Sequence, residues 1–107
     1  MPAAAKDIDM PYVKQELRQR VDSTLDELVQ RGLLHTNSQR ERKGLANYLV
    51  TRLVLRLLKP NDGWNYASLA DVDDTLDCAN KEIYRRLIAP YEDEAIKKNG
   101  DLSEFGV

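Results

Sequence analysis

The chain has 107 residues, about the length of a single domain. Its 16 basic and 18 acidic side chains give a net charge of −2, which argues against a general affinity for nucleic acid. One cysteine and one histidine exclude a disulfide framework and a Cys/His zinc site. No apolar run is long enough to cross a membrane, and the N-terminal residues lack the apolar segment of a secretory signal. We therefore expect a cytoplasmic protein.

The hydrophobic periodicity predicts an all-α fold, a small helical bundle of three main helices and a short C-terminal helix. Residues 1–10 show no periodicity and are expected to form a flexible tail, while Met10 offers an alternative translation start. Residues 11–100 are expected to form the helical domain, and residues 101–107 a second tail. No strand pattern or internal repeat occurs in the sequence.

The first predicted helix covers residues 14–31. Its apolar positions return to one face at steps of four, four, three and one. These positions are Leu17, Val21, Leu25, Leu28 and Val29. Gly32 is predicted to cap this helix, because glycine adopts the left-handed conformation without steric cost. Residues 33–37 are expected to form a loop.

The second predicted helix covers residues 38–59 and opens with a capping box, in which Ser38 and Glu41 each accept an unpaired backbone N–H. Pro60 disfavours helix before it. Gly44 is a weak point, and a start of ordered helix after it is the alternative. Ten of the fourteen residues from 45 to 58 are apolar, so we expect this helix to be covered on more than one side. It is then either the central helix or part of a subunit contact.

Residues 60–63 have the composition of a turn, and a third helix is predicted over residues 66–88. Pro90 is expected to end or kink that helix, and residues 91–98 to form a short fourth one that stops at Asn99 and Gly100. The third helix has apolar residues at steps of three and four. They are Leu69, Val72, Leu76, Ala79, Ile83 and Leu87.

Charge is distributed unevenly along the chain. Residues 14–59 carry ten basic and five acidic side chains, a balance of +5. Residues 60–107 carry five basic and eleven acidic ones, a balance of −6. Such halves attract each other, either within one chain or between subunits.

The sequence offers little to a catalyst, and we expect neither an enzyme nor a cofactor or metal site. The four aspartates between residues 71 and 77 resemble a cation site, but they lack an EF-hand's glycine turn and terminal glutamate, so a solvated face with Asp77 near Lys81 is the preferred interpretation. His35 has no Ser or Cys partner motif and is expected to be an inert loop residue. Cys78 is expected to be a small core residue.

Arginines and tyrosines recur within a turn or two of each other in two places. Guanidinium groups bind phosphates and aromatic faces stack on bases, so such clusters suit a small nucleotide. Pro90 would help to form the second cluster, because a break in the helix after Ile88 would bring Tyr91 back beside the end of the third helix. Local ion pairs with Glu82, or a subunit contact, are the alternative roles for these residues. The candidate ligand-binding residues are Tyr48, Arg52, Tyr84, Arg85, Arg86 and Tyr91.

Asn47 and Thr51 form a polar pair on the otherwise apolar second helix. A buried amide and hydroxyl must be hydrogen-bonded, so these side chains bind each other, a facing helix or a ligand.

Three stretches resemble a family of small uncharacterised proteins of bacteriophages and bacteria. They are residues 10–15 (MPYVKQ), residues 45–58 (LANYLVTRLVLRLL) and residues 81–101 (KEIYRRLIAPYEDEAIKKNGD). The family pattern runs MPY, then LNYxxTRL, then YRRxxAPYEDxxIxxNGD. This sequence departs from it in the nine residues before Met10 and in having Leu-Ala-Asn-Tyr for Leu-Asn-Tyr.

The resemblance implies a phage context but no activity. Small phage proteins without catalytic groups commonly bind host molecules, and some sequester cyclic nucleotide or cyclic ADP-ribose immune signals. We therefore expect a non-enzymatic binding protein that sequesters such an anionic nucleotide signal in host counter-defence. A protein-interaction module that binds and blocks a host protein is the alternative. A structural or regulatory phage component is a further alternative. Because the second helix is apolar nearly all round, we also expect a homo-oligomer. We expect no DNA, RNA or membrane partner.

Overall fold

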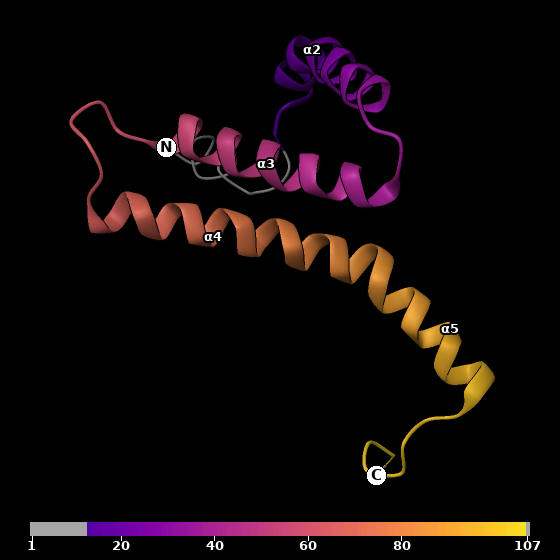
Figure 1. Ribbon diagram of the computed structural model, residues 1–107. Coiled ribbons are helices and arrows are strands. Elements are labelled where there is room, and N and C mark those ends of the chain that lie inside the picture. Colours follow the sequence, from indigo (N-terminus) through magenta and orange to yellow (C-terminus); the bar gives the residue numbers. More distant parts are fainter. Residues whose placement is uncertain (1–12, 107) are drawn as a thin grey trace. The chain divides into compact units, whose positions relative to one another are not determined.

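A computed structural model describes residues 13–106 of the chain, and helices account for most of them (Figure 1). The elements in chain order are α2 (Gln15–Leu34), α3 (Gln39–Leu58), α4 (Tyr66–Ile83), the π-helical segment η1 (Tyr84–Ile88) and α5 (Ala89–Asn99). No strand occurs in this part of the chain, which confirms the predicted all-α class. The predicted tail over residues 1–10, and the MPY motif that follows it, lie outside the described residues.

Helix α2 is longer than its hydrophobic pattern predicts. It continues through Gly32 to Leu34, and His35 ends it by donating its backbone N–H to the carbonyl of Arg31. Gly32 is therefore not the cap, because it does not adopt a positive φ. A Cβ atom at this position would lie 2.8 Å from Cδ2 of Leu45 in α3, so the glycine permits a close approach of the two helices. The residues predicted to form a loop from 33 to 37 shorten to a link from His35 to Ser38.

The capping box at the start of α3 is confirmed. The Ser38 hydroxyl accepts the backbone N–H of Glu41 at 3.1 Å. The Glu41 carboxylate in turn accepts the N–H of Asn37 at 2.8 Å, one residue before the usual partner. The helix runs through Gly44 without interruption and ends at Leu58, with Lys59 as its C-cap. The alternative start after Gly44 is thus wrong.

The turn predicted at residues 60–63 is present. Gly63 donates its N–H to the Pro60 carbonyl at 3.1 Å and has a φ of 98°, a conformation that favours glycine. Asn65 then starts α4 through a reciprocal cap that the sequence pattern did not indicate. Its side-chain oxygen accepts the N–H of Ser68 at 2.9 Å, and the Ser68 hydroxyl accepts the N–H of Asn65 at 3.0 Å.

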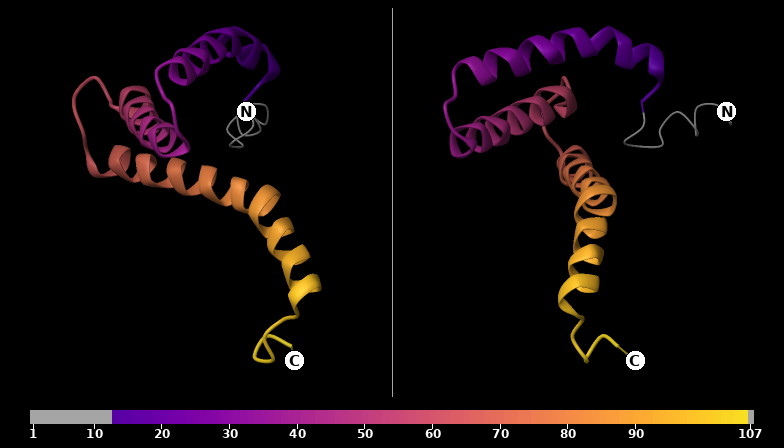
Figure 2. Two further views of the ribbon diagram at one scale, coloured as in Figure 1. Left: turned by 45° about the vertical axis from the view of Figure 1, so that its right-hand side comes forward. Right: turned by 90° about the vertical axis from the view of Figure 1, so that its right-hand side faces the viewer.

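Pro90 does not end the third helix, and of the two predicted outcomes only the kink occurs. Helical backbone continues from α4 through η1 into α5, and the ribbon bends in this region (Figure 2). Proline has no N–H to donate to the carbonyl of Arg86, and its ring crowds that carbonyl. The chain absorbs the mismatch in a π turn, where Ala89 donates to the carbonyl of Tyr84. Gly100 ends α5 as predicted, with a φ of 87°.

The chain divides into two compact units, residues 1–73 and 74–107. In the first unit, α2 contacts α3; in the second, η1 continues into α5. No hydrophobic side chain is buried among the described residues, and Thr36 and Ser68 are the buried polar ones. Helix α3 has no buried residue within the described part of the chain, so the structure does not show the covering predicted for this apolar helix.

Candidate binding surfaces

On α3, one predicted pair of site residues is brought together by helical spacing. Arg52 follows Tyr48 by one turn, and its Nη1 donates to the Tyr48 hydroxyl at 3.0 Å. The guanidinium carbon also lies 5.6 Å from the centroid of the tyrosine ring, within cation–π range. A guanidinium has five N–H donors, so the Arg52 group keeps donors for an anion while the tyrosine orients it.

The second group of predicted site residues lies on η1 and α5. Three of its side chains form ion pairs or hydrogen bonds with carboxylates of the same continuous helical stretch. The Glu82 carboxylate accepts from Arg85 at 2.7 Å and from Arg86 at 3.5 Å, which confirms the pairing anticipated as an alternative to ligand binding. The Tyr84 hydroxyl donates to the Glu92 carboxylate at 2.6 Å. That hydrogen bond, with the negative charge of Glu92, raises the pKa of the Tyr84 phenol above its ordinary value.

Tyr91 is 78% exposed on α5. The expectation that a chain break after Ile88 would return it beside the third helix is wrong, because the helix continues through Pro90. Of the six predicted site residues, Tyr48 and Arg52 thus lie in the first compact unit and the other four in the second.

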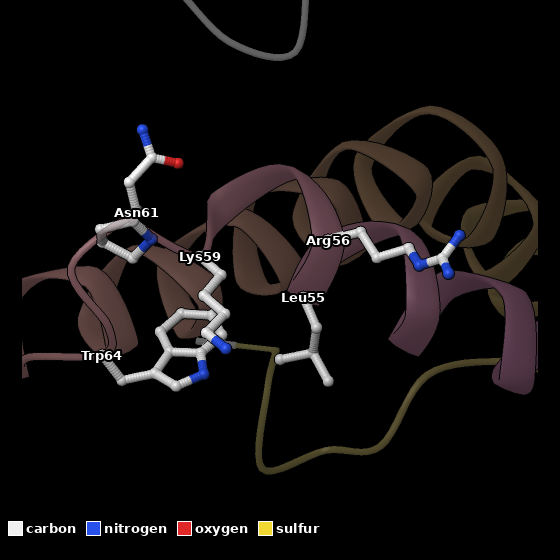
Figure 3. A pocket seen from close by; sticks show the side chains of 6 residues that line it. Leu55, Arg56, Lys59, Asn61 and Trp64 are labelled. Carbon is white, nitrogen blue, oxygen red and sulfur yellow. The ribbon is translucent and has the colours of Figure 1, made fainter.

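A pocket that the sequence analysis did not identify opens at the end of α3 (Figure 3). Its volume is about 500 Å³, and its lining residues are Leu55, Arg56, Lys59, Pro60, Asn61 and Trp64. Lys59 and Trp64 both line this pocket, and the Arg56 guanidinium extends away from them in the view of Figure 3. The lining thus combines two cations, an indole and an amide with no carboxylate. The signal for it was the single tryptophan four residues after Pro60, beside the basic end of the helix.

An apolar groove of about 180 Å³ lies between α2 and α3. Thr36, in the link between the two helices, forms hydrogen bonds to both of them. Its hydroxyl donates to the Gly32 carbonyl of α2 at 2.7 Å and accepts from Nε of Arg42 of α3 at 3.3 Å. Arg42 is the only charged residue of the lining. The lining residues are Leu28, Val29, Gly32, Leu33, Arg42, Leu45, Ala46 and Leu49.

The other candidate residues are accounted for within their own helices. Asp77 pairs with Lys81 at 2.7 Å, as expected, and this contact raises the pKa of Lys81. Within residues 13–106, no three His, Cys, Asp or Glu side chains are grouped closely enough to hold a metal ion. Cys78 is exposed, so its expected place in a core is wrong: it lies between Leu76 and Ala79 but off their apolar stripe. The Thr51 hydroxyl donates to the backbone carbonyl of Asn47 at 2.8 Å, a bond within its own helix.

No helix within the described part of the chain has the length and apolar character needed to span a bilayer. Residues 10–102 match the family described as a domain of unknown function, DUF6899. No curated protein and no solved structure shows significant similarity to the chain.

Proposed function

We propose that this chain, which belongs to the DUF6899 family, is a non-enzymatic, phage-type interaction protein that works in the host cytoplasm as a homo-oligomer and blocks a host protein. One observation carries the proposal: no hydrophobic side chain is buried within residues 13–106. A folded domain is stabilised mainly by burying apolar surface, and large exposed apolar patches are typical of protein interaction sites. A contact with further protein would cover these helices.

The exposed apolar side chains are continuous along helices rather than scattered. On α2, Leu17, Val21 and Leu25 repeat every four residues and all stand about half exposed. On α3, Val50, Leu53 and Leu57 are exposed as well. Stripes of this kind fit the grooves and helices of a partner protein.

Native mass spectrometry of the protein, purified under gentle conditions from its own host extract, tests the proposal. We expect a species that contains several copies of the 12.2 kDa chain together with one defined host protein. The variant Leu17→Asp/Val21→Asp on α2 should lose that protein, whereas Tyr66→Asp, which changes an exposed residue at the start of α4, should retain it. Self-assembly without any bound protein would contradict host-protein blocking and favour a structural phage component.

A second candidate function is the sequestration of an anionic nucleotide signal, such as a cyclic dinucleotide or cyclic ADP-ribose. Two observations favour it: the Arg52 guanidinium held over Tyr48, and the pocket that joins Arg56 and Lys59 with Trp64. Cations bind phosphates, and the indole offers a stacking surface for a base.

Calorimetry with cyclic dinucleotides and cyclic ADP-ribose isomers tests the second candidate. Loss of one bidentate phosphate contact costs about 1.5–3 kcal/mol, so Arg52→Ala, Arg56→Ala or Arg85→Ala should each weaken binding by roughly tenfold to a hundredfold if that residue holds the ligand. Arg20→Ala on α2 is the matched control. If wild type binds none of these compounds, or the three variants bind like wild type, sequestration at these residues is ruled out.

A further inference from the structure

Helix α3 carries an exposed apolar stripe with the spacing of a coiled-coil seam. Val50, Leu53 and Leu57 are separated by three and four residues, the alternation of a and d positions in a heptad. Their side chains are 46%, 45% and 79% exposed. Arg56 takes the flanking position g of the same heptad, where charged residues commonly select the partner helix.

Helix α4 carries a longer stripe of the same kind. Its apolar residues follow one another at steps of three, four, three and four, a strict heptad repeat. Asp73 and Glu82 take flanking positions of this heptad. The stripe consists of Leu69, Val72, Leu76, Ala79 and Ile83, of which Leu69, Leu76 and Ile83 are exposed.

The two stripes are flanked by opposite charge. Residues 42–61 contain five basic side chains and no acidic one, whereas residues 66–80 contain four aspartates and no basic one. Among the described residues, Arg56 and Lys59 form no ion pair, and neither do Asp71 and Asp73. Each helix therefore offers an apolar seam together with charges that suit the other helix.

We propose that the α3 stripe of one copy packs against the α4 stripe of a second copy, forming a dimer with two equivalent seams. This inference rests on the proposed function, since it names how the chain covers its apolar helices with its own kind. A second copy suits these stripes as partner, because each chain supplies both the stripe flanked by basic residues and the stripe flanked by acidic ones. A symmetric dimer forms the seam twice and brings further apolar surface together.

Charge reversal tests this pairing in a way that separates the two copies. The basic-reversed variant is Arg56→Glu, and the acid-reversed variant is Asp73→Lys, each at a position that flanks its seam. Each variant alone places like charges across both seams, so its self-dissociation constant should rise about tenfold or more, measured by sedimentation velocity. Mixing the two variants restores opposite charges in both seams of a heterodimer, and its dissociation constant should return close to the wild-type value.

Two further variants complete the test. Asp101→Lys changes the net charge as much as the acid-reversed variant, but outside the helices, and should associate like wild type. The chain that combines both reversals should also self-associate like wild type. Circular dichroism confirms that each variant remains helical before its association is measured.

The outcomes distinguish this inference from the proposed function. Rescue by mixing supports pairing between copies. If wild type self-associates but neither reversal weakens it, the seam inference is wrong while the oligomer stands. If the reversals destabilise the fold, and only the combined chain but not the mixture recovers, the stripes pair within one chain. A wild type that stays monomeric overturns both the seam and the proposed oligomer.

Discussion

The pair α2–α3 and the helical stretch from Asp74 to Asn99 are stabilised in different ways. In the first, residues from two helices meet, as at Gly32 with Leu45 and at Thr36 with Arg42. In the second, ion pairs such as Asp77–Lys81 and Glu94–Lys97 join residues three or four positions apart along one helical path. Exposed pairs of this kind contribute only a few tenths of a kcal/mol each. The second region therefore depends on helix propensity and on whatever covers it, whereas the first already has a packed contact.

Replacing Pro90 should have the largest effect, because it changes the weakest point of the second region. Pro90→Ala introduces a backbone N–H donor and removes the proline ring from the preceding helical turn, so the π turn is no longer required. We expect the free energy of unfolding to rise by about 1–3 kcal/mol and the helical ellipticity to increase. Thermal and urea unfolding followed by circular dichroism measure both.

The matched control for this change is Pro60→Ala, which alters a proline in the turn before α4. It should leave stability unchanged or lower it slightly, because the turn gains flexibility in the unfolded chain. A Pro90→Ala variant that is less stable than wild type would mean that the π turn itself is required by the native contacts.

Two glycines inside the helices of the first region, Gly32 and Gly44, differ in what a Cβ atom would meet, so alanine should affect stability differently at each. At Gly44 a Cβ atom meets open space, so Gly44→Ala should stabilise the protein by about 0.5–1 kcal/mol through helix propensity. At Gly32 the same atom would meet the Leu45 side chain at 2.8 Å, which offsets that gain. We expect Gly32→Ala to be less stable than Gly44→Ala by about 1 kcal/mol in urea unfolding. Equal stabilisation by both alanines would show that α2 and α3 do not approach closely at this point.

The capping box at the start of α3 gives a further prediction about the free energy of unfolding. Ser38→Ala removes the acceptor of the Glu41 N–H and should lower the free energy of unfolding by about 1 kcal/mol. Ser23→Ala, in the middle of α2, should be neutral or slightly stabilising, because alanine is the better helix former there. Urea unfolding of the two variants side by side tests the cap, and equal values would argue against it.

The smallest effect concerns the titration of Tyr84. Its phenol donates to the Glu92 carboxylate, which favours the protonated form and raises its pKa above 10.0. The stabilisation from this bond is therefore complete below the pKa of the unfolded phenol and is lost as the pH rises through the raised folded value. Glu92→Gln should lower the pKa of Tyr84 in an NMR or absorbance titration, and Glu94→Gln should not. If the pKa of Tyr84 is unchanged in Glu92→Gln, the hydrogen bond between Tyr84 and Glu92 does not form in solution.

Features that depend on neighbours in the sequence were predictable. The capping box at Ser38, the turn ending at Gly63, the helix stop at Gly100 and the pairing of Glu82 with two arginines each involve residues at most four positions apart. Spacing on a helix or the chemistry of a turn fixes these interactions without knowledge of the rest of the fold.

Features that depend on a second element were not predictable from the pattern. Gly32 has the position of a helix cap, but it serves the approach of Leu45, thirteen residues later. Pro90 reads as a helix end, yet the backbone had the alternative of a π turn. The pocket at Trp64 needs the path of the chain after Pro60 to bring the indole to the pocket that Arg56 and Lys59 also line.

We propose that contact with further protein completes the helices of one chain. Size-exclusion chromatography with light scattering, across micromolar concentrations of wild type, tests it most directly. We expect a mass that is a multiple of 12.2 kDa and that falls toward the mass of one chain only on dilution. A constant mass of 12.2 kDa, together with cooperative unfolding at a midpoint independent of concentration, would show that a single chain folds by itself and would contradict the claim.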